Sequence, residues 1–265
     1  MTARFTRFTV ALLAAAPFAA APLRAQGVEY AVGTTKYRLH TTTKGSQTTP
    51  MGSAQFEVGL REQLTVNISK QSRDTVKAQV TIDSIVLKST SPIPDVSKLN
   101  GSKYVSLISP TGKFYSTKAP DGLDPALAQI LEGVGRFLPS FRGNIAQGLR
   151  WTDTTNSKVV QQGMDLDRTS VSSYTVAGDT TIGGEKAYRV KRITAVTIAG
   201  SGSMQGSPVS MASTGSGNGA FFITPKGVYL GGAWADDVDV KITILAQNAE
   251  IIIKQNSTSR VEAIK

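Results

Sequence analysis

The side chains that could perform chemistry in this chain are few. His40 is the only histidine, so a Ser-His-Asp triad would have to use it. It alternates in phase with Arg38, which indicates an exposed structural position. Cysteine is absent and no G-x-S-x-G elbow occurs, so the usual activated nucleophiles are missing. The sequence therefore predicts a protein that is not an enzyme.

The sequence also contains few residues in patterns that could bind a metal or a cofactor. The densest acidic group, Asp236-Asp237-Val238-Asp239, lacks the D-x-D-x-D-G spacing of a calcium loop, and we expect a solvated strand start there. Most other carboxylates alternate with apolar residues and should face outward, so no glycosidase pair is expected. The run from Gly200 to Gly206 has its third glycine one position late and no following helix, which excludes a dinucleotide loop. We expect no metal and no cofactor.

Residues 124–138 predict an amphipathic helix among segments that otherwise alternate with a period of two. Asp124 can cap its N-terminus, and Pro125 fits the first helical position. Gly133 and Gly135 weaken the helix by roughly 1 kcal/mol each relative to alanine, so packing against a sheet must hold it. Its apolar stripe consists of Leu127, Ile130, Leu131, Val134 and Leu138.

A long hairpin ahead of this helix is predicted by strict alternation. Apolar residues share one face of each strand, and only Glu62 interrupts the series. The apolar register slips at Ile85-Val86-Leu87, where a bulge or bend would curve the sheet. The alternating residues are Phe56, Val58, Leu60, Leu64, Val66 and Ile68, then Val76, Ala78, Val80 and Ile82.

Two turns of one type punctuate the chain. Ser109-Pro110-Thr111-Gly112 and Thr224-Pro225-Lys226-Gly227 both place proline second and glycine last, which marks either an internal duplication or a turn preference that arose twice. Residues 148–153 are predicted to form an irregular link carrying Trp151, and the Gly- and Ser-rich stretch 200–219 a flexible hairpin tip. Later strands are expected over 165–176, 186–198, 209–224, 228–236, 238–246 and 250–261.

The predicted fold class is therefore mainly β. We expect a large curved antiparallel sheet, or a half-open β-barrel, wrapped around the single mid-chain helix. Residues 1–25 predict a secretory signal peptide, because Arg4 and Arg7 precede an apolar core and a cleavage point follows Ala25. Residues 26–265 should then form one β-rich domain, and its location should be periplasmic or secreted.

The charge of the chain constrains its partners. The formal charge of +10 becomes +7 (10 − 3) once Arg4, Arg7 and Arg24 leave with the signal. Because the basic residues are scattered along alternating strands, we expect no nucleic-acid partner. Peripheral contact with an anionic membrane surface fits a basic exported protein better.

In its architecture the chain resembles the outer-membrane lipoprotein carrier-like superfamily. The resemblance lies in the signal, the hairpin from Phe56 to Leu87, the mid-chain helix, and the turn-and-strand phrase Thr180-Thr181-Ile182-Gly183-Gly184-Glu185-Lys186-Ala187-Tyr188-Arg189-Val190. It implies a half-open barrel around helices that shelters acyl chains.

Two functions remain open at this point. The first is an exported envelope protein that binds a lipid or lipoprotein acyl chain, without catalysis, in a groove between sheet and helix. The second is a structural or protein-interaction module with a filled core and no ligand. An outer-membrane β-barrel fits less well, because aromatic residues are sparse and the chain ends in Lys265. The residues expected to line the groove are Leu127, Leu131, Val134, Leu138 and Trp151.

Overall fold

The chain forms long antiparallel strands connected mostly by short turns. The computed structural model describes residues 27–90, 95–118, 134, 137–161, 163–204 and 206–264. The elements are β1 (Gly33–Thr49), β2 (Gly52–Lys70), β3 (Val76–Ser89), the 3-10 helix η1 (Val96–Leu99), β4 (Lys103–Ile108), β5 (Phe114–Lys118), β6 (Arg150–Gln161), β7 (Met164–Ile182), β8 (Glu185–Met204), β9 (Ser207–Ile223), β10 (Tyr229–Ile244) and β11 (Ala249–Ile264).

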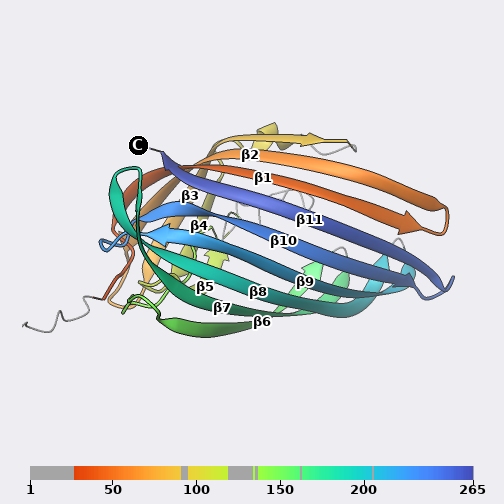
Figure 1. Cartoon of the computed structure of the whole chain (residues 1–265). Coiled ribbons are helices and arrows are strands. Elements are labelled where there is room, and N and C mark those ends of the chain that lie inside the picture. Colours follow the sequence, from red (N-terminus) through yellow and green to blue (C-terminus); the bar gives the residue numbers. More distant parts are fainter. Residues whose placement is uncertain are drawn as a thin grey trace, which may run out of the picture.

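All 11 strands belong to one curved sheet, in the order β5-β4-β3-β2-β1-β11-β10-β9-β8-β7-β6. Strands β5 and β6 are its two edges, so the sheet does not close on itself. Figure 1 shows the long strands running side by side. The turns β2–β3, β7–β8 and β9–β10 lie at one end, here called the core end, and the turns β1–β2, β8–β9 and β10–β11 lie at the other, the tip end. The predicted fold class is confirmed.

One face of the sheet carries the hydrophobic core, and we call it the inner face. In β2 and β3 every second side chain is buried toward the core end, which follows from the period-two alternation of strands. Leu64 and Ile82, which pair directly, are 0% exposed. The ladder between the two strands shifts at Gln63 and Leu64 and leaves Asp83 unpaired. A bulge was expected at 85–87, and the structure places it just before that segment.

Segments outside the sheet cover the inner face at the core end. The Tyr30 hydroxyl donates to the Pro139 carbonyl at 2.6 Å, and the Tyr30 ring packs edge-on against Phe141 with centroids 5.0 Å apart. The Val28 amide donates to the Gly143 carbonyl at 2.6 Å. These contacts tie residues 27–31 to residues 139–143 and close this end of the core.

The two proline–glycine turns clamp the segment 28–31 between them. In both turns the first residue's hydroxyl accepts the amide hydrogen bond of the residue after the glycine, at 2.9 Å for Ser109 and 3.0 Å for Thr224. The Tyr30 amide then donates to the Pro110 carbonyl at 2.7 Å, and the Ala31 amide donates to the Gly227 carbonyl at 3.1 Å. The repeated turn sequence therefore builds two matching supports for one segment.

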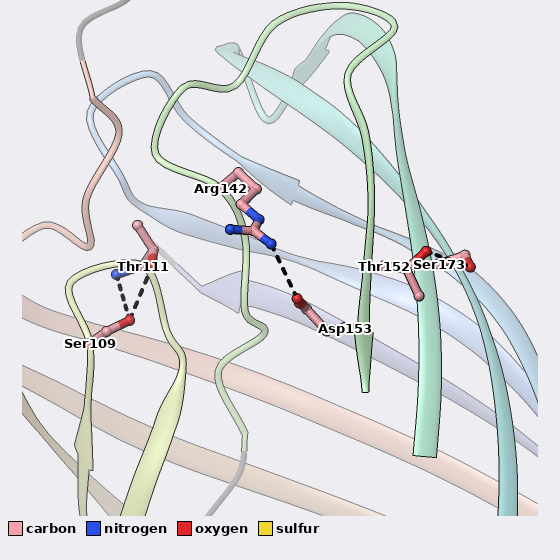
Figure 2. Close-up of polar contacts among 6 residues, drawn as sticks. All are labelled: Ser109, Thr111, Arg142, Thr152, Asp153 and Ser173. Atoms are coloured by element: carbon pink, nitrogen blue, oxygen red, sulfur yellow. Dashed lines mark hydrogen bonds and ion pairs between the residues drawn. The ribbon is translucent and has the colours of Figure 1, made fainter. Parts of the chain in front are cut away.

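An ion pair joins this cover to an edge of the sheet. The Arg142 Nη2 atom lies 3.6 Å from the Oδ1 atom of Asp153 in β6, and Figure 2 shows the guanidinium directed toward that carboxylate. Both groups are more than a third exposed, so the pair contributes little stability. In the same view, the Ser109 hydroxyl accepts from the Thr111 amide at 3.3 Å within its turn.

Three local predictions were wrong. Residues 150–153 start strand β6 and are not an irregular link, because they pair fully with β7. Strand β10 runs unbroken through 236–238, where two strands were expected. The stretch 200–219 lies almost entirely in β8, which ends at Met204, and β9, which begins at Ser207. In each case the segment forms a strand because it pairs with a long neighbouring strand, or with one on each side. This pairing outweighs the weak strand propensity of Asp, Gly and Ser.

Two other predictions fall on residues outside the described ranges. These are the signal peptide over 1–25 and most of the helix over 124–138. Val134, described on its own, has a helical backbone and is 4% exposed, and its carbonyl accepts from the Phe137 amide at 3.3 Å.

The turn that supports residues 28–31 gives a stability prediction. Gly227 has φ +81°, and an added Cβ would collide with the Glu29 carbonyl oxygen. Gly184 has φ +85° and open space around its Cβ position. Gly184→Ala should therefore cost only the left-handed backbone term, about 1 kcal/mol, whereas Gly227→Ala should cost at least about 2 kcal/mol more. Urea unfolding of both variants measures the difference, and equal losses would mean that the segment 28–31 is not held by this turn.

Candidate functional site

The inner face is covered at the core end and changes character beyond it. Successive cross-strand rows of side chains run across the sheet, and they can be followed from the pairing registers. The last apolar row of the core contains Ile85, Glu62, Leu39, Val261, Phe221, Val190 and Val176. The next row contains Leu87, Leu60, Thr41, Ser259, Trp234, Gly219, Arg192, Tyr174 and Trp151. We call this second row the aromatic row.

From the aromatic row toward the tip end, the inner face carries hydroxyl groups that hydrogen-bond to one another. Thr41 and Ser259 are 2.9 Å apart, Thr43 and Ser257 are 2.8 Å apart, and all four come from β1 and β11. Because paired hydroxyls satisfy part of each other's hydrogen-bonding capacity, the inner face here is polar without carrying a net charge. On the same face, the Ser172 hydroxyl of β7 and the Thr194 hydroxyl of β8 are also hydrogen-bonded, at 2.9 Å.

Glycines on β9 let the side chains of β10 lie across the sheet. A Cβ on Gly219 would come within 2.5 Å of the Trp234 Cβ, and one on Gly217 would collide with the Asp236 carboxylate. The Trp234 ring consequently reaches toward β8, where the Arg192 guanidinium carbon lies 5.8 Å from the ring centroid. This is a cation–π contact across an intervening strand.

Asp236 is the acidic member of this region. It was expected to sit at a solvated strand start, but it lies mid-strand on the inner face and is half-buried. Burial raises the pKa of its carboxyl, and the nearby Arg192 opposes that shift. Asp237 points to the outer face, where it accepts from Asn256 at 2.6 Å.

Two apolar surfaces continue the inner face toward the tip end, one half-buried and one with a buried centre. The first, which we call the apolar lane, comprises Phe56, Val58 and Leu60 on β2 with Leu87 on β3. Phe56 lies over Gly45 of β1, where an added Cβ would come within 2.5 Å of the ring. The second surface is a cluster near the tips, with Met164, Leu166 and Val209 buried and Ile198, Met211, Ile242 and Ile244 packed against them.

Glu62 is the ionisable group of the last core row. Its side chain occupies a position between Leu60 and Leu64 on the inner face, and the residue is only 2% exposed. Its Oε1 atom has no hydrogen-bond partner. Removal from water disfavours the carboxylate, so burial raises the pKa of Glu62 from 4.5 to about 7. Glu62 pairs with Ile85, directly beside the bulge at Asp83.

Tyr104 of β4 lies close enough to interact with Glu62. Its hydroxyl also has no hydrogen-bond partner, and the residue is 3% exposed. Burial raises the pKa of the Tyr104 hydroxyl to about 12, and the Glu62 charge adds to that shift. Two buried polar groups without hydrogen-bond partners therefore lie within electrostatic range of each other, and Glu62 is the one in the last row of the core.

The residues predicted to line a groove have separate positions. Leu127 and Leu131 fall outside the described residues. Val134 lies in the core and is 4% exposed, and Leu138 is half-buried and packs against the core. Trp151 lies in the aromatic row, stacked on Tyr174 with centroids 4.8 Å apart and rings 9° from parallel. The Trp151 indole N–H has no hydrogen-bond partner.

Sequence reasoning missed several residues of the inner face. For Glu62 the available signal is its interruption of the apolar series along β2. Trp234 and Arg192 become neighbours only through the glycine between them. Tyr104 comes within electrostatic range of Glu62 only because β3 pairs with both β2 and β4. No short-range pattern encodes these contacts.

The outer face carries two shallow hollows that share His40. One has a volume of about 450 Å³ and lies over β1, β11, β10 and β9. The other has a volume of about 590 Å³ and lies over β1, β2 and β3. His40 itself is exposed, as expected. Within the described residues no group of three or more His, Asp or Glu side chains could hold a metal ion, and no helix is long and apolar enough to span a membrane.

Comparison with known proteins gives distant structural likenesses. No family model and no curated protein matches the chain. An outer membrane lipoprotein-sorting protein domain from Vibrio parahaemolyticus is 11% identical over 86% of this chain and 85% of that one, with a TM-score of 0.18. Neisserial surface protein A is 12% identical over 86% and 98%, with a TM-score of 0.16. A DUF1329 family protein from Desulfovibrio piger is 8% identical over 84% of each chain, with a TM-score of 0.14. Scores this low establish no common fold.

The buried carboxyl gives a pH prediction. Below pH 4.5 Glu62 is protonated in both the folded and the unfolded chain, so its ionisation does not lower the free energy of unfolding. Between pH 4.5 and about 7 the unfolded chain ionises first, so stability falls, and above about 7 the full penalty of about 3 kcal/mol remains. Glu62→Gln removes this dependence. Its stability relative to the wild type should therefore rise by about 3 kcal/mol from pH 4 to pH 8.

Urea unfolding at the two pH values measures this change, and other titrating groups cancel in the difference. Glu57→Gln, on the outer face of the same strand with its side chain 52% exposed, is the matched control and should show almost no change. A pH-independent difference for Glu62→Gln would show that the carboxyl is not desolvated.

Proposed function

We propose that this protein is an exported component of the cell envelope that binds the acyl chain of a lipid or lipoprotein on the inner face of its sheet, without catalysis. A curved, unclosed sheet with one apolar face supports this proposal, because such a face is stable only where something covers it. The predicted signal peptide and the basic mature chain support an envelope location.

The observation that carries the proposal is the apolar lane. Val58, Leu60 and Leu87 belong to the inner face, yet none of them is fully buried. They continue the row pattern of the core beyond its covered part, so the sheet presents an apolar strip about 4–5 residues long on β2. Burial of this strip under an acyl chain would gain roughly 25 cal/mol for each Å² of apolar surface removed from water.

The alternative is an interaction module without a ligand. Val134 is buried and Phe137 packs against Tyr37 with centroids 5.0 Å apart, so the core end is filled by the chain itself. An acyl chain therefore belongs beyond these residues, on the lane, and not among them. If the lane binds nothing, the filled core is the better description of the whole protein.

Two valines on opposite faces test the proposal. Val58 lies on the inner face and Val86, 50% exposed, lies on the outer face of the adjacent strand. Val58→Asp places a charge in the lane and should weaken binding of a fluorescent fatty acid at least tenfold, whereas Val86→Asp should leave it unchanged. Fluorescence titration of the purified mature protein measures both affinities.

Circular dichroism checks that both variants retain the β-sheet spectrum. Equal affinities for the two variants would mean that the fatty acid does not bind on the apolar lane. A wild-type protein that binds no fatty acid, and from which no amphiphile is extracted after purification from its own host, would favour the interaction module.

A further inference from the structure

Glu62 and Tyr104 present an unusual combination of burial and missing partners. Buried polar atoms in proteins are almost always hydrogen-bonded, and each exception calls for a water, an ion or a ligand to complete it. Here Oε1 of Glu62 and the hydroxyl of Tyr104 are both without a partner, in residues 2% and 3% exposed, and they interact electrostatically with each other.

Among the described residues, Tyr104 of β4 is the titratable group that interacts with Glu62. The two residues that pair with Glu62, Leu39 and Ile85, are apolar, and Tyr37 of β1 pairs with Leu64, two residues along β2. The Tyr37 hydroxyl is already used, since it donates to the Tyr229 carbonyl at 3.0 Å. Arg61 and Lys88, the nearest basic residues along β2 and β3, lie on the outer face. No described cation therefore compensates the carboxylate.

Glu62 lies at the head of the apolar lane, and Tyr104 interacts with it from the core side. Glu62 follows Leu60 on the same face of β2, so Phe56, Val58 and Leu60 lead directly to it, over a distance of about 20 Å along the strand. The bulge at Asp83 lies opposite, and bulges commonly re-aim side chains beside functional sites. A ligand lying on the lane would bring one of its ends to the Glu62 carboxyl.

We propose that Glu62 and Tyr104 bind the protonated amine of a cationic amphiphile whose hydrocarbon chain lies on the apolar lane. This inference rests on the proposed function and names the head group that the site selects. An ammonium group has three donors and no acceptor, so it can donate to the Glu62 carboxylate and to the Tyr104 oxygen together. A carboxylate or phosphate head group would instead meet an uncompensated negative charge, and an alcohol supplies a single donor.

The proposal requires the ionised form of Glu62. Alkylamines remain protonated across the neutral range, so the pH dependence of binding should follow this carboxyl. Because burial raises its pKa to about 7, amine binding should strengthen as the pH rises from 5.5 to 8. Decanol, which needs no charge on the protein, should not show this trend.

The experiment compares decylamine, decanol and decanoate by isothermal titration calorimetry, each below its micelle-forming concentration. At pH 8 the wild type should bind the amine roughly ten- to hundredfold more tightly than the carboxylate. Glu62→Gln should lose this preference and keep decanol binding, and Tyr104→Phe should weaken the preference in part. Glu57→Gln, the same substitution on the outer face, should behave as the wild type.

The outcomes separate the two proposals. If none of the three ligands binds, the acyl-chain function itself is wrong. If decanol binds but the wild type and Glu62→Gln discriminate equally between amine and carboxylate, the buried pair holds only water and the head-group inference is overturned. Unfolding cannot mimic the expected result, because Glu62→Gln is the substitution that should make the protein more stable at pH 8.

Discussion

A single sheet can bury only the part of its face that other segments cover, and this constraint shapes the whole molecule. Among the described residues, the cover at the core end includes residues 27–31, the turn 109–112, Val134 and residues 137–149, held by backbone hydrogen bonds such as that from the Tyr30 amide to the Pro110 carbonyl. Where the cover is present, the inner face is a close-packed row of Leu, Ile, Val and Tyr side chains. Where it ends, the composition of the same strands changes within one row.

That change explains why polar and small residues occupy the middle of the inner face. Hydroxyl pairs such as Thr41 with Ser259 need no cover, because they satisfy one another and remain compatible with water. Glycines on β9 let Trp234 and Arg192 meet across a strand, which extends an aromatic surface over backbone that would otherwise be bare. Glu62 is the exception to this division, since it places an ionisable group on the covered side of the boundary.

The sequence was informative wherever structure depends on local periodicity. Alternation from Phe56 to Ile68 predicted β2, its pairing with β3 and the face that is buried, and the proline–glycine turns were visible directly. Strand β6 was missed because residues 150–157 contain one apolar side chain, Trp151, and so show no apolar alternation; their pairing with β7 is decided by the sheet. The interruption at Glu62 and the register slip near Ile85 are both visible in the sequence, but only the pairing register shows that these two residues lie opposite each other.

The position of β1 in the sheet determines when the fold can be completed. This strand pairs on one side with β2 and on the other with β11, so Thr41 contacts Ser259 across a separation of 218 residues. Without β11 the remaining strands would divide into two sheets, one from β1 to β5 and one from β6 to β10. Loop closure over so long a chain is slow, and it must wait for synthesis of the last strand. The two parts of the sheet can therefore join into one only after the C-terminal strand is available.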